Sequence, residues 1–356
     1  MRLSFRYITR AILCLSWLLS ACGALTPPLK ATFTPSPSSA PTFTQAPTTT
    51  PTATPAPPMA ALLAPDGADQ MLAKSLQTDL NDVFTRAGLH WQVREQLAPA
   101  DLTSSLKLVV ALPPDPGIAQ LAVAAPETQF LAVGIPGLTA SSNLTVIGSS
   151  DERPDQQGFI AGVIAAMLSA DWRVGVISLS DTVAGRAAGT GFLNGVEYFC
   201  GLCRPAHPPF YEYPLSIELP STSTSPEWQE AANYIADHDV LTVYVYPAAG
   251  DESMLSNLAD AGINIISSGV PPAVALSRWV LSLATDPMPL IKSQVQGLLD
   301  GTITGGGSLL VPIQFAEINT TLFTPGKQRL AQQILSDLQA GYIDTAVDMT
   351  TGERRP

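Results

Sequence analysis

Residues 158–180 read GFIAGVIAAMLSADWRVGVISLS, and this stretch decides the fold of the chain. Its first part, residues 158–170, is apolar and uncharged. A helix needs roughly 20 such residues to cross a bilayer, so this run is too short. The charged break Asp171-Trp172-Arg173 follows, and then the apolar run 174–179. The stretch therefore predicts a buried helix that leads into a buried strand.

The same alternation continues on both sides of this stretch, from Met59 onward. Short apolar runs such as LKLVVALP (106–113) and VLTVYVYPAAG (240–250) alternate with amphipathic ones such as MLAKSLQTDLNDVFTRAG (71–88). Strand alternating with helix is typical of parallel βαβ units, and near-continuous apolar strands indicate a sheet covered on both faces. We expect an α/β fold with doubly wound parallel sheets, in which ligands bind at the carboxyl ends of the strands.

The amino terminus predicts export and a lipid anchor. Residues 1–21 combine three arginines with a short apolar run, which is the layout of a secretory signal. The run ends in Leu-Ser-Ala-Cys, so Cys22 lies where a bacterial lipoprotein receives its lipid. A plain signal peptide with an incidental cysteine is the alternative. We expect Cys22 to hold the protein, lipid-anchored, to the extracytoplasmic face of the cell membrane.

Residues 22–58 form the link between this anchor and the body. They are rich in Thr and Pro and almost free of charge. Such a composition cannot bury a core, and it predicts a disordered tether or an O-glycosylated stalk.

Composition and motifs narrow the function classes. The chain has 30 Asp and Glu against 18 Lys and Arg, a net charge of −12, and no basic cluster, which argues against nucleic acid as a partner. It has no nucleophile elbow, zinc-protease motif or phosphate loop, and its three histidines lie far apart. We therefore expect no enzyme, no cofactor and no metal. Asp and Glu residues are scattered along the chain, so the sequence does not exclude a hydrolase that uses a pair of carboxylates.

Cys200 and Cys203 are the cysteines outside the signal and anchor. Their spacing suits a redox pair, half of a zinc site with His207, or a local disulfide. The pair ends a predicted helix and opens a Pro-rich loop, whereas redox pairs begin a helix. We predict a structural disulfide, since the expected compartment is oxidising.

The string QQGFIAGVIAAMLSADWRVGVISL (156–179) resembles a helix and strand of the basic-membrane-protein-type solute-binding lipoproteins, the nucleoside-binding group of type 1 periplasmic binding proteins. GTGFLNGVEYF (189–199), the turn at Ala249-Gly250 and the helix end at Asp300-Gly301 are similar to further family segments, in the same order. The ordered set spans most of residues 59–342.

This resemblance implies two α/β lobes joined by a hinge of crossing strands, near residues 146–149, 267–270 and 309–312. The first lobe would comprise residues 59–146 plus about 268–308. The second lobe would comprise residues 147–267 plus about 309–345. Ligand would be held between the lobes, which would close around it.

The resemblance also implies a ligand site made of a carboxylate, three aromatic rings for stacking, and two glycines that let a ligand approach the backbone. These residues are Asp69, Phe159, Phe192, Tyr246, Gly250 and Gly269. A helix cap for Asp69 and core packing for the aromatic residues are the alternatives. The sequence departs from the nucleoside-binding pattern at Leu72 and Ala73, where the family has an aromatic residue and an asparagine, and no acid follows Gly269.

From these features we expect a monomeric protein that captures a small, nucleoside-like solute and delivers it to an ABC-type importer. A sensory or accessory envelope lipoprotein with the same fold is the alternative. An envelope enzyme is a third.

Overall fold

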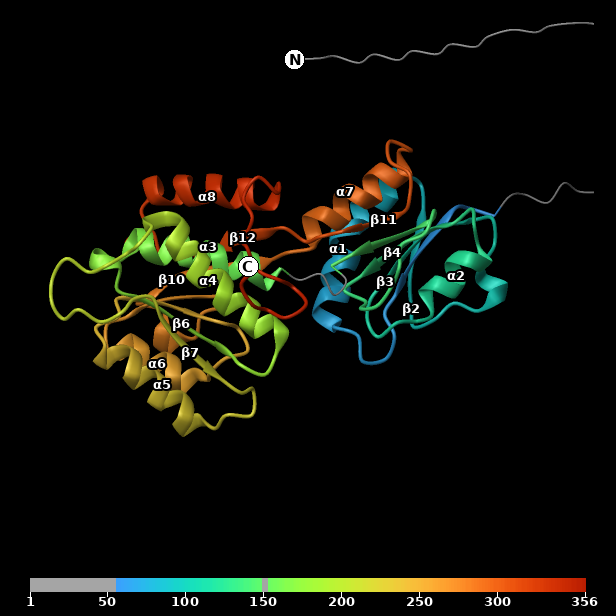
Figure 1. Cartoon of the computed structure of the whole chain (residues 1–356). Coiled ribbons are helices and arrows are strands. Elements are labelled where there is room, and N and C mark those ends of the chain that lie inside the picture. Colours follow the sequence, from blue (N-terminus) through green and yellow to red (C-terminus); the bar gives the residue numbers. More distant parts are fainter. Residues whose placement is uncertain (1–55, 149–152) are drawn as a thin grey trace, which may run out of the picture. The chain divides into compact units, whose positions relative to one another are not determined.

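The computed structural model describes residues 56–148 and 153–356, which contain two six-stranded sheets (Figure 1). The predicted signal, Cys22 and nearly all of the tether lie outside these residues. Strand order is β11-β5-β4-β3-β1-β2 in the first sheet and β12-β10-β9-β8-β6-β7 in the second. All neighbouring strands are parallel except β10 and β12.

The first lobe is the sheet built mainly from the amino-terminal half of the body. Its strands are β1 (Met59–Leu63), β2 (His90–Arg94), β3 (Leu106–Ala111), β4 (Gln129–Val133), β5 (Leu144–Ile147) and β11 (Gly307–Leu309). Helices α1 (Gln70–Arg86) and α7 (Met288–Leu299) cover one face, and α2 (Ile118–Ala124) covers the other. A one-turn 3₁₀ helix, Pro99–Asp101, precedes β3.

The second lobe has the same layered plan. Its strands are β6 (Val174–Leu179), β7 (Leu215–Leu219), β8 (Thr242–Val245), β9 (Asn264–Ser267), β10 (Trp279–Thr285) and β12 (Ile313–Ala316). One face packs against α3 (Pro154–Leu168), α4 (Val183–Cys200) and α8 (Pro325–Gln339), and the other against α5 (Ser225–Asp237) and α6 (Glu252–Asp260). Short 3₁₀ turns occupy Ala170–Trp172 and Ala273–Ala275.

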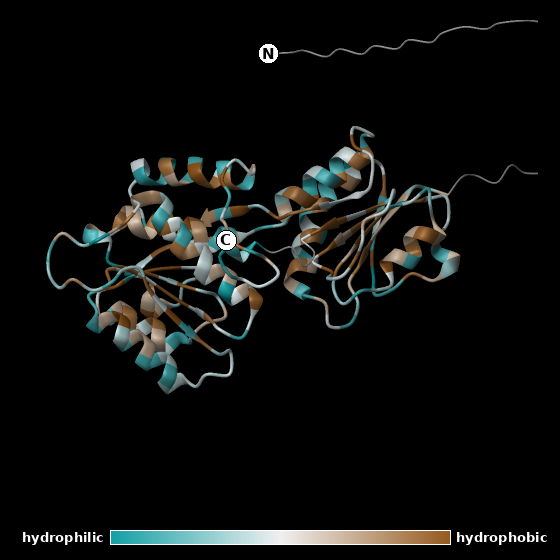
Figure 2. Ribbon diagram, viewed as in Figure 1, coloured by the Kyte–Doolittle hydropathy of each residue, from teal (hydrophilic) through white to brown (hydrophobic). Residues whose placement is uncertain are grey.

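The strands form because their residues are apolar on both faces. All six residues of β6 and all four of β5 are buried, as expected for parallel strands between two helical layers. In Figure 2 the strands of each sheet are largely brown, the colour of hydrophobic residues, whereas the outer helix α8 has both brown and teal segments. The predicted doubly wound α/β fold is confirmed.

The stretch at 158–180 forms α3, a short turn and β6, as its pattern predicts. Helix α3 has 15 residues, of which 12 are buried. Among residues 56–148 and 153–356, no helix is both long enough and apolar enough to span a bilayer.

One lobe boundary differs from the expectation. We expected residues 268–308 in the first lobe, but β10 is hydrogen-bonded to β9 and β12 in the second sheet. The chain therefore passes to the first lobe at residues 286–287, between β10 and α7, and not near residues 267–270. An apolar strand can pair with either sheet, so its sequence alone does not reveal its partner.

Candidate ligand cavity

A cavity of about 460 Å³ lies at the carboxyl ends of β3, β4 and β5. The start of α1, the start of α3 and the two segments 285–287 and 310–313 complete its wall. Its apolar lining residues are Leu72, Leu112, Pro113, Val133, Ile147, Pro287, Leu310, Val311, Pro312 and Ile313. Its polar lining residues are Asp69, Arg153, Gln156, Gln157, Thr285 and Gln339. None of the described lining residues is aromatic, so the contacts available are aliphatic packing and hydrogen bonding.

Asp69 is held at the cavity by its role as the N-cap of α1. Its Oδ1 accepts hydrogen bonds from the backbone N–H groups of Met71 (2.8 Å) and Leu72 (3.1 Å), which would otherwise lack partners. In the described part of the chain, Oδ2 has no partner. The carboxylate can therefore cap the helix and still accept a hydrogen bond from a ligand hydroxyl or N–H group.

Arg153 is the cationic side chain among the described lining residues. Its Nε and Nη2 donate to the two carboxylate oxygens of Asp155, at 2.8 and 2.7 Å. Asp155 is completely buried in the first turn of α3, and it also accepts a hydrogen bond from Thr345 Oγ1 at 2.6 Å. The hydrogen bonds that Arg153 donates to the Asp155 carboxylate raise the pKa of Arg153 above its ordinary value. The guanidinium is thus charged and fixed in orientation.

Two glutamines add acceptors to the wall. The Gln156 amide donates through Nε2 to the carbonyl of Leu338 (3.3 Å), and Gln339 donates through Nε2 to the carbonyl of Ile313 (2.9 Å). Each of these bonds uses one of the two amide N–H groups, and the amide oxygens can receive ligand donors.

Of the six residues expected to bind ligand, Asp69 lines this cavity. Phe159 and Phe192 are 2% and 0% exposed and belong to the apolar core around α3 and α4. The ring of Phe192 stacks on Tyr244 with centroids 6.1 Å apart. These two phenylalanines are core residues, so the expectation that they stack on a ligand is replaced by the packing alternative.

Tyr246, Gly250 and Gly269 lie at the carboxyl ends of β8 and β9 in the second sheet. Tyr246 is half-buried and directly follows β8, and Gly250 and Gly269 adopt positive φ angles of 88° and 82°. None of the three is among the residues that line the described cavity. They lie at the edge of the sheet where this fold class binds ligands, and their role remains a prediction.

Five polar residues of the cavity wall were not predicted from the sequence, namely Arg153, Gln156, Gln157, Thr285 and Gln339. For the first three a signal was present, since they come directly before an apolar helical stretch and close to an expected crossing point. A lone arginine beside an aspartate two residues away also occurs on many surfaces, so the sequence did not separate a buried pair from an exposed one.

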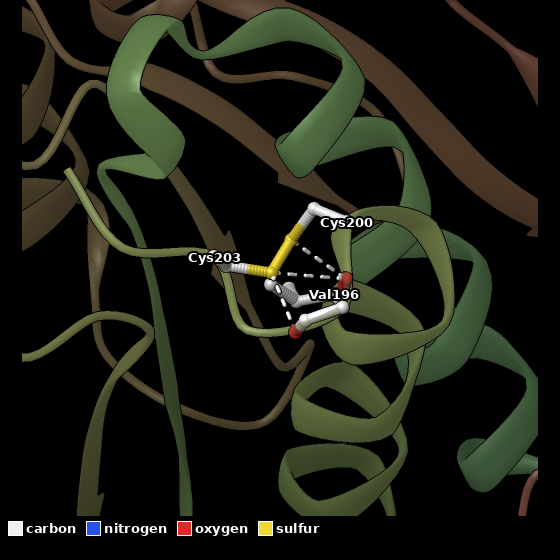
Figure 3. Close-up of a disulfide and its surroundings, with 4 residues drawn as sticks. Val196, Cys200 and Cys203 are labelled. Carbon is white, nitrogen blue, oxygen red and sulfur yellow. Dashed lines mark hydrogen bonds between the residues drawn. A yellow bond between two sulfur atoms is a disulfide. The ribbon is translucent and has the colours of Figure 1, made fainter. Parts of the chain in front are cut away.

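Cys200 and Cys203 form a disulfide at the end of α4 (Figure 3), with Cα atoms 5.3 Å apart. The helix ends at Gly201, whose φ of 69° suits glycine. Both sulfur atoms lie near the carbonyl oxygen of Val196, at 3.0 and 3.6 Å. The Nδ1 atom of His207 lies 3.1 Å from Asp171, and the described residues contain no His, Cys, Asp and Glu cluster that could hold a metal.

Many solved structures share this architecture, among them the following two. An ABC transporter system solute-binding protein from Conexibacter woesei matches 81% of this chain and 98% of its own, with a TM-score of 0.55 and 19% identity. A transcriptional activator of the comK gene from Bacillus halodurans matches 83% of this chain and 99% of its own, with a TM-score of 0.51 and 14% identity. No protein-family model and no curated protein matches in sequence. The chain has the two-lobe α/β fold of type 1 periplasmic binding proteins.

Proposed function

We propose that this protein is an extracytoplasmic solute-binding protein that captures a small molecule for an ABC-type importer. The observation that carries the proposal is the cavity at the carboxyl ends of β3, β4 and β5, where this fold class binds its ligands. Its volume of about 460 Å³ suits a small molecule, and its wall combines aliphatic side chains with a few polar groups.

The proposal includes the anchor and the site of action. The sequence of residues 1–22 supports export and a lipid on Cys22, which would place the body outside the cytoplasm on the membrane surface. The protein would act as a monomer and catalyse no reaction. Ligand would favour the closed arrangement of the lobes, and a permease would distinguish it from the empty one.

The resemblance of residues 156–179 supports a nucleoside-like ligand. The cavity wall supports binding through hydrogen bonds and aliphatic contacts instead of ring stacking. A nucleoside would therefore present its sugar hydroxyl groups or base N–H groups to Asp69 and the glutamine amides, and its ring to the aliphatic wall.

A thermal-shift screen of the purified full-length protein against nucleosides, bases, sugars, amino acids and short carboxylic acids tests this function. A ligand present at 100 times its Kd should stabilise the folded protein by about 2.7 kcal/mol, which gives a clear rise in Tm. The bound solute should be recovered unchanged after incubation. If no solute class raises the Tm, the solute-binding proposal fails.

The shared fold of the Bacillus halodurans transcriptional activator supports a second candidate, a sensory or accessory lipoprotein that binds solute without transport. Uptake of the radiolabelled ligand separates the two. Deleting the gene should abolish high-affinity uptake if the protein serves an importer, and should leave uptake unchanged if it serves a sensor.

A further inference from the structure

Asp155 is a buried carboxylate whose partners lie on distant parts of the chain. A buried carboxylate is costly unless hydrogen bonds and an opposite charge compensate it. Asp155 has both, because Arg153 gives it two hydrogen bonds and Thr345 gives it a third. Its two oxygens are thus shared between the cavity wall and the carboxyl-terminal part of the chain.

Thr345 is fixed in place by the C-terminal segment, residues 344–355. The backbone carbonyl of Thr345 accepts a hydrogen bond from Asn194 Nδ2 at 2.8 Å. Farther along, the carbonyl of Gly352 accepts from Thr190 Oγ1 at 2.8 Å, and Arg354 pairs with Glu197 at 2.8 Å. All three anchoring side chains belong to α4, so the segment is tied along this helix and holds Thr345 against Asp155.

The geometry of the Arg153–Asp155 pair decides what the cavity can recognise. The carboxylate uses Nε and Nη2, and in the described part of the chain Nη1 has no partner. The Arg153 side chain is 34% exposed and lines the cavity, so its free N–H groups are available to a ligand. Because the pair is neutral overall, its donor does not require an anion and suits any strong oxygen acceptor.

We propose that Arg153 is the specificity-determining donor of this cavity, that it binds a carbonyl or carboxylate oxygen of the ligand, and that Asp155 and Thr345 are positioning residues that aim it. The inference rests on the proposed solute-binding function and deepens it. Asp69 accepts a hydrogen bond from the same ligand, which therefore carries an sp² oxygen and a donor group.

Isothermal titration of the full-length protein with three probes tests the donor role. Uridine offers base carbonyl groups and donor groups, 2-hydroxyisovalerate offers a carboxylate and a hydroxyl group on an aliphatic body, and ribitol offers hydroxyl groups alone. We expect binding of uridine, 2-hydroxyisovalerate or both, weakened about tenfold to a hundredfold by Arg153→Gln, as for a hydrogen bond to a charged group. Arg94→Gln is the matched control, because Arg94 pairs with Asp101 at 2.7 Å and is 32% exposed but lies outside the cavity.

A double-mutant cycle tests the positioning role. Thr345→Val and Asp155→Asn should weaken binding of the same probe in the native background and have no further effect in the Arg153→Gln background. If Thr345 and Asp155 had only a structural role, the two substitutions would weaken binding equally in the native and the Arg153→Gln backgrounds. Thr190→Val removes another hydrogen bond to the C-terminal segment without touching Asp155, and its affinity should match the native value. If Asp155→Asn does not fold, the cycle is carried out with Thr345→Val and Arg153→Gln only.

Three results overturn the inference. They are binding of ribitol alone, binding that Arg153→Gln leaves unchanged, and failure of both sp²-oxygen probes to bind. If a solute from the thermal-shift screen still binds in any of these cases, the proposed function stands and only the role of Arg153 falls.

Discussion

The two lobes share one architecture but bury their first helices in different ways. In the first lobe, α1 packs on the sheet through large side chains, Leu76, Leu80, Val83 and Phe84. In the second lobe, α3 and α4 make the most extensive helix–helix contact of the described chain and meet backbone to backbone. Large side chains fill the core of both lobes, but only α3 and α4 also approach each other closely at glycine positions.

Four glycines, two on each helix four residues apart, produce the close contact of α3 and α4. A Cβ added at Gly158 would lie 2.0 Å from the carbonyl oxygen of Ala188, and one at Gly162 would lie 2.2 Å from that of Phe192. The same holds in the other direction, because a Cβ added at Gly191 would lie 2.3 Å from the carbonyl oxygen of Asp155, and one at Gly195 would lie 2.0 Å from that of Phe159. The close contact gives a physical reason for glycine at these four positions.

The largest effect of a single truncation should come from the side-chain-packed lobe. Leu80 is completely buried under the first sheet. Leu80→Ala should lower the free energy of unfolding by about 2–5 kcal/mol, from lost burial plus the cavity left behind. Urea denaturation followed by circular dichroism measures the loss. A loss below that of a surface variant such as Leu330→Ala would contradict the packing described.

Adding a methyl group should be the damaging change in the glycine-packed lobe. Gly195→Ala should destabilise the protein by about 1–3 kcal/mol, because helix propensity favours alanine but the new Cβ forces the two helices apart. Gly326 on α8 has open space around it, and Gly326→Ala is the control, expected to be neutral or stabilising. Equal Tm values for the two variants would show that the helices do not approach this closely.

The N-caps of the two lobes separate stability from binding. Asp69 caps α1 at the cavity, and Asp251 caps α6 with a 2.8 Å hydrogen bond from the Met254 N–H but lies outside the cavity. Each change to alanine should cost about 1 kcal/mol of stability. Of the two variants, only Asp69→Ala should also weaken ligand binding. An equal loss of affinity in Asp251→Ala would remove Asp69 from the site.

The smallest expected effect concerns Glu218 on β7. Burial and the nearby Glu353 raise the pKa of this carboxyl above its ordinary value of 4.5, although Arg186 opposes them. The unfolded chain therefore loses the proton more easily, so ionisation destabilises the fold as pH rises through 4.5. At pH 7, Glu218→Gln should raise the free energy of unfolding by less than about 1 kcal/mol, because Glu218 is exposed to solvent, and so raise the Tm slightly. At pH 3.5–4 the Tm should not change. A Tm gain that persists at the lower pH would contradict this origin.

The sequence was sufficient for the features that depend on local pattern. The apolar pattern of 158–180 predicted α3 and β6, and a helix cap was one of the two roles expected for Asp69. The features that depend on contacts between distant parts of the chain could not be predicted from the sequence. The hydrogen bond between Asp155 and Thr345 spans 190 residues, and β10 pairs with two strands, β9 and β12, that its own residues do not specify. Phe159 and Phe192 were assigned to the ligand because an aromatic side chain suits a core and a binding site equally well.

The most direct test of the central claim is to fill the cavity from its rim. Leu310 lines the cavity and is 49% exposed, and Leu330 on α8 is 49% exposed and lies outside it. Isothermal titration measures the affinity of Leu310→Trp and Leu330→Trp for the solute found by thermal shift. Both variants place a tryptophan at a half-exposed leucine, but only Leu310→Trp should block the cavity. We predict loss of binding in Leu310→Trp and native affinity in Leu330→Trp. Native affinity in both variants would show that the solute binds elsewhere.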